Sequence, residues 1–337
     1  MKSPLRNLLL SLALSTLGGL PSPAAEPVSY PTVGSIERLD PRFDQLVPAD
    51  AKIEKLAEGF IWSEGPVWIR HGAYLLFSDI PRNSVMKWQQ GPGLSLFMKP
   101  SGYTDSKLRE GESGSNGLLV DPQGRLVLCQ HGDRRVVRVE KDGRWTTLAD
   151  RYQGKRLNSP NDATFRSNGD LYFTDPPYGL AKKAVRELDF CGLYRVSAAG
   201  HISLLARDLT APNGIAFSPD EKTLYVANSD PKHAVWMAYD VLPDGGIGRG
   251  RVFYDATAQL KTMKGLPDGL KLDRAGNLFA TGPGGVNVFT PGGKLLGRIR
   301  TGQATANCCF GDDGSTLYMT AHMFICRVRT STKGQGY

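Results

Sequence analysis

Six oxygen-bearing side chains recur along this chain at similar intervals, and each opens the same short pattern. The pattern runs from a polar residue through small or apolar residues and a turn to an apolar strand. Consecutive members are 52, 45, 52, 55 and 39 residues apart. Turn geometry explains why glycine follows several of them, but not why the first position carries an oxygen every time. The six positions hold Glu64, Asn116, Asn161, Asn213, Asp268 and Asn307.

Carboxylate and amide oxygens are the ligands that hard divalent cations prefer, and Ca²⁺ takes roughly six to eight of them. Glu64 and Asp268 would balance the charge of such an ion, and Asn161 and Asn213 would add neutral oxygens. Because these residues do not fill the coordination shell, water or a substrate could complete it. We therefore predict a divalent-metal site formed by these four residues, with Ca²⁺ favoured over Zn²⁺, Mg²⁺ or Mn²⁺. Asn161 could contact the substrate instead of the ion.

A second series of residues falls 14 or 15 positions after the first, where each predicted hairpin returns. Two of the five histidines of the chain belong to this series. We predict that His131 and His322 contact a bound substrate, together with Asn116 and Asn161. The two aspartates of the series could instead cap the ends of strands. The series holds Asp79, His131, Asp175, Asn228, Gly282 and His322.

The elements that must position these side chains are short strands. Apolar runs such as 171–175 and 224–228 contain β-branched and aromatic residues without a helical period, and Gly, Asn and Asp mark the turns between them. The repeat length suits a four-stranded propeller blade of about 40–50 residues. The last repeat lacks one strand, which residues 52–57 could supply. We predict an all-β, six-bladed β-propeller with four-stranded blades, closed by an N-terminal strand that protects the sheet edges.

The chain divides into four predicted segments. Residues 1–25 have the basic start, apolar stretch and small closing residues of a secretory signal peptide. Residues 26–50 form an N-terminal arm, 51–330 the propeller and 331–337 a C-terminal tail. The apolar stretch is too short to span a bilayer, and no later segment qualifies. We therefore expect a periplasmic or secreted protein without a membrane anchor.

Composition excludes several classes of function. The 39 glycines and 22 prolines among 337 residues indicate many turns. The net charge is +8, but the basic residues do not cluster or alternate with aromatic residues, so we expect no nucleic-acid partner. The chain has no zinc-protease helix motif, phosphate loop or nucleophile elbow. The five cysteines are expected to be buried thiols. We expect a small-molecule partner and a monomer or small homo-oligomer.

Several motifs of this chain resemble the SMP-30/gluconolactonase/regucalcin-like family. They are SEGPVW at 63–68, SPND at 159–162, PNGIAFSPD at 212–220 and LPDGL at 266–270. TDPPYGL at 174–180, VWMAYD at 235–240 and FATGPGGV at 279–286 resemble its bacterial gluconolactonase branch.

The resemblance implies a six-bladed propeller, a divalent ion on its axis, usually calcium, and hydrolysis of lactones. It assigns Glu64, Asn213 and Asp268 as metal ligands and Asn161 as a ligand or substrate contact, and it matches Asp268 to the family's proposed general base. Animal members carry an Arg where this chain has Ser159. The PPYGL loop replaces a substrate-contacting Glu of those members, so sugar recognition is expected to differ.

These observations together predict an exported, calcium-dependent hydrolase of a sugar lactone such as gluconolactone. Water would attack the metal-polarised carbonyl while Asp268 acts as the base. A related propeller esterase or phosphotriesterase and a non-catalytic sugar-binding propeller remain the alternatives.

Overall fold

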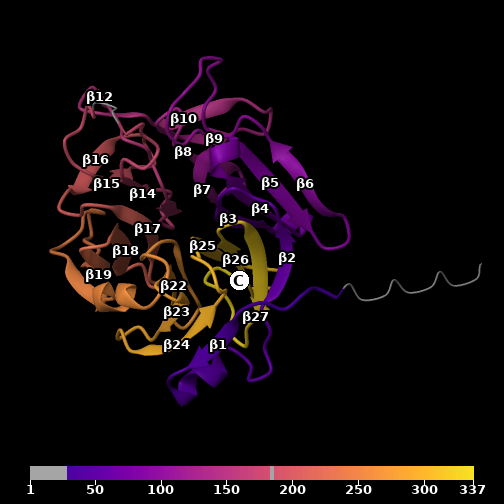
Figure 1. Cartoon of the computed structure of the whole chain (residues 1–337). Helices are drawn as coiled ribbons and strands as arrows, with labels where there is room; N and C mark the ends of the chain where they lie inside the picture. The colour runs from indigo at the N-terminus through magenta and orange to yellow at the C-terminus, as the bar shows by residue number, and fades with distance from the viewer. Residues whose placement is uncertain (1–28, 183–185) are drawn as a thin grey trace, which may run out of the picture.

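The computed structural model describes residues 29–182 and 186–337. The predicted signal peptide at 1–25 lies outside these residues. Within them, antiparallel sheets follow one another around a common axis (Figure 1). The innermost strands β3, β7, β13, β17, β21 and β25 contact one another in sequence, and β25 returns to β3. This closed ring confirms the predicted six-bladed propeller.

The first three blades are each a four-stranded antiparallel meander that begins with its innermost strand. A two-stranded hairpin, β11 (Arg151–Tyr152) and β12 (Lys155–Arg156), follows the second blade. The strands are β3 (Ser63–Ile69), β4 (Tyr74–Asp79), β5 (Ser84–Gln89), β6 (Gly93–Met98), then β7 (Ser115–Val120), β8 (Leu126–Gln130), β9 (Arg135–Val139), β10 (Trp145–Ala149), then β13 (Ala163–Phe165), β14 (Leu171–Asp175), β15 (Gly192–Val196) and β16 (Ile202–Ala206).

The last three blades repeat this order, with additions from the N-terminal part of the chain. Their strands are β17 (Pro212–Phe217), β18 (Thr223–Asp230), β19 (His233–Asp240), β20 (Arg251–Asp255), then β21 (Leu270–Leu272), β22 (Leu278–Gly282), β23 (Gly285–Phe289), β24 (Leu295–Arg300), then β25 (Asn307–Gly311), β26 (Thr316–Ala321) and β27 (Phe324–Arg329). Short 3₁₀ helices occur at η1 (Pro41–Gln45), η2 (Arg70–Gly72), η3 (Ile80–Arg82) and η4 (Thr257–Lys261).

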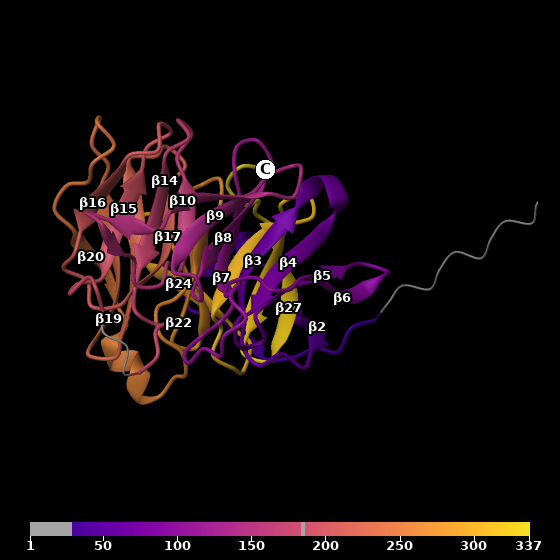
Figure 2. The same cartoon turned by 90° about the horizontal axis from the view of Figure 1, so that it is seen from above.

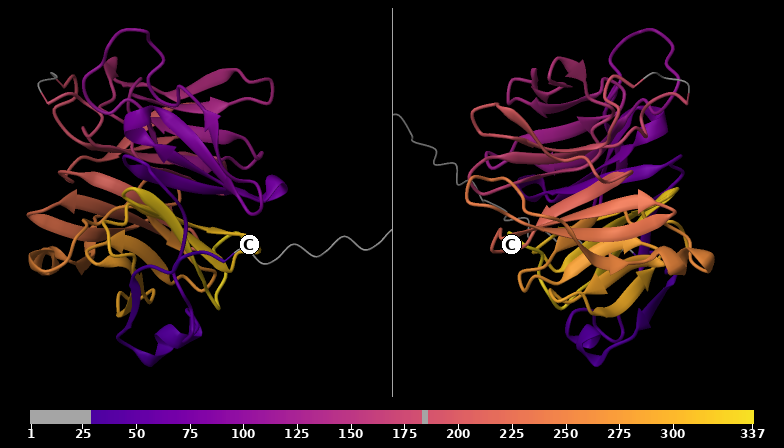
Figure 3. Two further views of the ribbon diagram at one scale, coloured as in Figure 1. Left: turned by 45° about the vertical axis from the view of Figure 1, so that its right-hand side comes forward. Right: turned by 90° about the vertical axis from the view of Figure 1, so that its left-hand side faces the viewer.

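The N-terminal strand closes the ring as the incomplete last repeat predicted. Strand β2 (Glu54–Glu58) pairs antiparallel with β27 and becomes the outermost strand of the sixth blade. The preceding arm is less featureless than expected, because β1 (Ser35–Arg38) pairs with β24 and gives the fifth blade a fifth strand. Figure 3 shows this indigo segment on the outside of the ring, and Figure 2 shows β2 beside β27. No helix of the described residues is long and apolar enough to cross a membrane.

Apolar side chains fill the spaces between adjacent sheets. The large rings of Trp88 and Trp236 are almost completely buried, and so are Phe279 and Phe289. All five cysteines are buried and free, as the sequence predicted. The core therefore lies between the blades, which leaves the axis lined by the polar residues that begin each inner strand.

Hydroxyl side chains on the second strands of three blades tie each of these blades to the next one near the axis. Ser78 Oγ donates to the carbonyl oxygen of Asn116 at 2.8 Å, and Thr174 Oγ1 donates to that of Asn213 at 2.7 Å. Thr281 Oγ1 donates to the carbonyl oxygen of Ala306 at 2.8 Å. Since these bonds end on anchor residues or their neighbours, they hold the start of β7, β17 and β25 in place.

The close approach of adjacent inner strands predicts a steric requirement at Gly65. Its φ is +51°, and a Cβ atom there would lie 2.0 Å from the carbonyl oxygen of Asn116. Gly91 is a matched control, because its φ is +89° and a Cβ atom there meets nothing within 4 Å. We predict that Gly65→Ala lowers the free energy of unfolding by about 1–3 kcal/mol more than Gly91→Ala, measured by urea denaturation. Equal losses would contradict the close approach.

Candidate metal and substrate site

A cavity of about 300 Å³ lies at the end of the ring where the inner strands begin. It gathers carboxylate and amide side chains from five of the six blades together with four aromatic or aliphatic side chains. Its lining residues are Trp62, Glu64, Ile80, Glu112, Asn116, Asn161, Tyr178, Asn213, Ser229, Leu266 and Asp268. All four predicted metal ligands and the predicted substrate contact Asn116 are therefore brought together here.

Local backbone irregularity aims these side chains at the axis. Glu64, Asn116 and Asn213 are each the second residue of their inner strand. The pairing register shifts directly after Glu64, and Asn116 and Asn213 lie within the shifted segments of their strands. Such bulges bend the strand and redirect its side chains. Asn161 and Asp268 lie two residues before β13 and β21, where strand pairing has not yet begun.

Hydrogen bonds orient some of these groups and leave others free. Asn213 Nδ2 donates to Ser229 Oγ at 3.0 Å, and this bond leaves the amide oxygen of Asn213 for another partner. The Oδ1 atoms of Asn116, Asn161 and Asp268 are buried without a hydrogen-bond partner in the described part of the chain. Buried oxygens of this kind need a ligand, because an unsatisfied polar atom costs about 1–3 kcal/mol.

Three carboxyl groups crowd the axis and repel one another. Burial raises the pKa of Glu64 to about 8, and the nearby Asp162 adds to this rise. Burial also raises the pKa of Asp268 well above its usual range, with further contributions from Glu64 and Asp162. Lys271 offsets part of the rise that burial causes in the pKa of Asp162. A bound cation would relieve this repulsion.

The donor set fits a hard divalent cation. It combines two carboxylates with amide oxygens that lack partners, which is the ligand type that Ca²⁺ accepts in flexible geometry. No group of three or more His, Cys, Asp or Glu side chains arranged to hold a metal occurs among the described residues, so the candidate site depends on the mixed set. The lining residues include neither His nor Cys, the ligands most typical of Zn²⁺.

Asp162 is a functional candidate that the repeat pattern did not reveal. It follows Asn161, at a position where four other repeats have glycine, and its Oδ1 would lie 2.8 Å from a Cβ atom placed on Gly117. Asn307 Nδ2 donates to Asp162 Oδ2 at 3.3 Å, and Asn307 Oδ1 accepts from the backbone N–H of Cys308. Asp162 and Asn307 thus occupy a buried layer beside the cavity. The replacement of this glycine by Asp162 is the sequence signal that could have identified it.

The two histidines predicted to contact substrate do not line the cavity. His131 is completely buried, and its Nδ1 lies 2.6 Å from Glu112 Oε2. His322 packs edge-on against Trp62 at a ring distance of 5.1 Å. Each histidine therefore lies behind a residue that does line the cavity. Trp62, Glu112 and Tyr178 were missed because they belong to loops that share no repeat position.

Other members of the second series brace the loops that lead to the anchors. Asp79 Oδ1 accepts from the backbone N–H groups of Ile61 and Trp62. Asn228 Oδ1 accepts from that of Ala211 at 2.9 Å. Asp175 accepts in the same way from residues 158 and 159. These contacts match the strand-capping alternative for the two aspartates.

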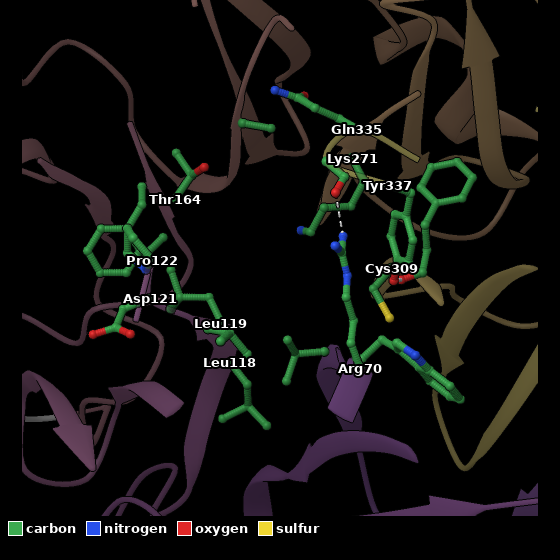
Figure 4. Close-up of a pocket in the computed structure, with 18 of the residues that line it drawn as sticks. Arg70, Leu118, Leu119, Asp121, Pro122, Thr164, Lys271, Cys309, Gln335 and Tyr337 are labelled. Atoms are coloured by element: carbon green, nitrogen blue, oxygen red, sulfur yellow. Dashed lines mark hydrogen bonds between the residues drawn. The ribbon is translucent and has the colours of Figure 1, made fainter. Parts of the chain in front are cut away.

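A larger cavity of about 690 Å³ lies further along the inner strands, towards the other end of the ring. Apolar residues such as Leu118 and Leu119 face it, and the C-terminal tail covers one side (Figure 4). Arg70 Nη2 donates to the carbonyl oxygen of Gly336 at 2.7 Å there, and its guanidinium lies over the ring of Tyr337. Because the two carboxylates that line this cavity, Asp121 and Glu221, are paired with Arg125 and Arg166, we place the candidate site in the smaller one.

The sequence was compared with models of known protein families. The model described as the SMP-30/Gluconolactonase/LRE-like region matches residues 62–323, which include every anchor. The chain belongs to this family. The SMP-30/gluconolactonase/LRE-like match thus covers the propeller from just before β3 to just before β27.

Relatives in the family include enzymes of similar length. A gluconolactonase from Zymomonas mobilis is 39% identical over 340 residues, covering 96% of this chain and 93% of the relative. The solved structure of a gluconolactonase from Xanthomonas campestris is 32% identical with a TM-score of 0.80, covering 91% of this chain and 98% of that one. Regucalcin from Agrobacterium tumefaciens, described as a calcium-binding protein, shares the fold at 20% identity and a TM-score of 0.66, covering 84% and 94%.

The buried carboxyl groups predict how stability depends on pH without metal. Glu64, whose pKa rises from 4.5 to about 8, keeps a proton in the folded state that the unfolded chain loses. Stability should therefore fall as the pH rises through that interval. Asp175, whose pKa rises to about 7, contributes with the same sign. We predict a falling thermal midpoint for the metal-free protein between these pH values, measured by calorimetry.

A variant at position 64 tests how much Glu64 contributes to this pH dependence. Glu64→Gln cannot lose a proton, so its midpoint should fall less steeply over the same interval. Added Ca²⁺ should raise the wild-type midpoint more at the upper end, where fewer protons compete for the carboxylates. A midpoint that rises with pH, or equal slopes in the two proteins, would contradict the crowding of these groups.

Proposed function

We propose that this protein is a divalent-metal-dependent lactone hydrolase that acts on a neutral sugar lactone such as gluconolactone. The gluconolactonases among its relatives support a gluconolactonase-type hydrolase. The observation that carries the metal dependence is the convergence of buried carboxylates and unpartnered amide oxygens in one open cavity.

We infer that Glu64, Asn213 and Asp268 hold the ion, with Asn161 either completing the ligand set or facing the substrate. Ca²⁺ is the preferred ion because the donors are all oxygens of mixed charge. A divalent cation bound there would polarise the lactone carbonyl and make its carbon more electrophilic. The open side of the cavity leaves space for the substrate.

Side chains around the cavity have separate roles in the proposed reaction. Asp268 takes the proton of the attacking water, since its Oδ1 has no other partner. Asn161 Nδ2, also buried and unpartnered, donates to the oxygen that becomes negative at the carbonyl. When the ring carbon–oxygen bond breaks, Asp268 returns the proton to the leaving alkoxide. The product is the open-chain hydroxy acid.

We also propose that residues 1–25 direct export to the periplasm or the medium. Their basic, apolar and small-residue regions support this proposal. Mass spectrometry of the mature protein from its native host should find the N-terminus near residue 25 or 26. An intact Met1 in the functional protein would contradict it.

Metal dependence and the role of Asp268 can be tested together. We predict that a chelator abolishes hydrolysis of glucono-δ-lactone, followed by proton release, and that Ca²⁺ restores it. Asp268→Asn keeps an oxygen donor but removes the base, so kcat should fall by about 10²–10⁴-fold. Activity that survives chelation or this substitution would contradict the proposal. Aldonate binding without turnover would favour a sugar-binding propeller instead.

Because Asn213 is a neutral ligand, replacing it with a carboxylate should change Ca²⁺ affinity and the rate of lactone hydrolysis in opposite directions. Asn213→Asp adds a third carboxylate beside Glu64 and Asp268. The added charge should tighten Ca²⁺ binding, measured by calorimetry, but lower kcat because it weakens the pull of the ion on the carbonyl. Unchanged Ca²⁺ affinity with faster lactone hydrolysis would contradict this account.

A further inference from the structure

Glu112 brings another carboxylate to the rim of the candidate site. It lies in the connection between β6 and β7 and lines the same cavity as Glu64 and Asp268. Its charge is close enough to contribute to the raised pKa of Glu64. Its side chain is 40% exposed, unlike those of the axial carboxylates. Glu112 is therefore placed to meet a ligand that enters from solvent.

His131 holds this carboxylate by one oxygen. The imidazole is completely buried, and its Nδ1 lies 2.6 Å from Glu112 Oε2. A carboxylate accepts hydrogen bonds, so the tautomer of His131 with a proton on Nδ1 is the one that orients Glu112 through this contact. The other ring nitrogen, Nε2, is buried without a hydrogen-bond partner in the described part of the chain. The pair thus fixes Oε2 and leaves Oε1 of Glu112 for another donor.

Three loops interlock around the pair. Arg109 Nη2 donates to the carbonyl oxygens of His131 and Gly179, at 3.3 and 2.5 Å. A Cβ atom on Gly111, whose φ is +88°, would lie 2.7 Å from the oxygen of Gly179. One on Gly179 would lie 2.5 Å from the Cβ of His131. The loop with Gly179 also carries Tyr178, which lines the cavity, so the position of Glu112 is built into the cavity wall.

A carboxylate at this position suits hydroxyl groups. It accepts hydrogen bonds from neighbouring hydroxyls, and bonds to a charged acceptor are stronger than neutral ones. Trp62 and Tyr178 line the same cavity and offer apolar ring surface for the carbon face of a sugar. We propose that Glu112, oriented by His131, binds hydroxyl groups of a polyhydroxylated lactone and sets the preference of the enzyme for such substrates.

The inference rests on the proposed lactonase function and assigns the residues that recognise the hydroxyl groups of the substrate. Glu112 also disfavours ligands that carry a further negative charge, because Glu64 and Asp268 line the same cavity. A neutral sugar lactone is therefore preferred over a phosphorylated one. In this scheme His131 is a positioning residue, which acts on the substrate through Glu112.

Two lactones of different chemistry separate recognition from hydrolysis. Glucono-δ-lactone carries hydroxyl groups, whereas δ-valerolactone has the same ring without them. We predict that Glu112→Ala lowers the ratio of kcat/KM for glucono-δ-lactone to kcat/KM for δ-valerolactone by about 10- to 100-fold, mainly through KM. Glu110→Ala removes an exposed carboxylate two residues earlier and should change the ratio by less than about twofold.

A double-mutant cycle tests the pairing with His131. His131→Ala should lower the ratio in the wild-type background but add little to Glu112→Ala. An unchanged ratio in Glu112→Ala, or equal loss on both lactones, would overturn the proposal whether or not the His131 variant folds. Failure of the lactonase proposal itself would look different, since wild-type hydrolysis of both lactones would then be absent or would survive chelation.

Discussion

The burial of several carboxyl groups beside one another on the propeller axis is the constraint on which the candidate site depends. Glu64, Asp162 and Asp268 are held within reach of one another in a site that burial shields from water. An open sheet could relax by moving its strands apart. The closed ring prevents this, because the inner strands contact one another in sequence and β2 completes the last blade. A cation bound among these groups would offset both their burial and their repulsion, which is the basis of the proposed metal site.

Small residues and hydrogen bonds from side-chain hydroxyls to the backbone hold the strands together at the axis. Glycine follows four of the six anchors, and hydroxyl groups on the second strands bond the carbonyl oxygens of the next blade. The loops at this end of the ring add cavity-lining residues that have no equivalent in the repeats. The segment before β7 and the segment after β14 carry Glu112 and Tyr178 into the cavity. In the proposed enzyme, the repeats thus supply the metal ligands, and the loops supply the residues that select the substrate.

Much of this architecture could be predicted from the sequence, because each blade begins with the same polar anchor and turn. The missing strand of the last repeat revealed the closure by β2. The short strand β1 was missed because four residues on a sheet edge leave no alternating pattern. His131 and His322 were predicted to contact substrate from equal spacing alone, which does not show that Glu112 and Trp62 stand in front of them. Asp162 was missed because it follows an anchor.

The position of a bound cation tests the account most directly. Crystals grown with Ca²⁺, and with Mn²⁺ as an anomalous scatterer, would locate it. The account predicts one strong peak in the smaller cavity, ligated by Glu64, Asn213 and Asp268, and lost in Asp268→Ala. A peak elsewhere, or none at saturating Ca²⁺, would contradict the claim that the axial carboxylates and amides form a metal site.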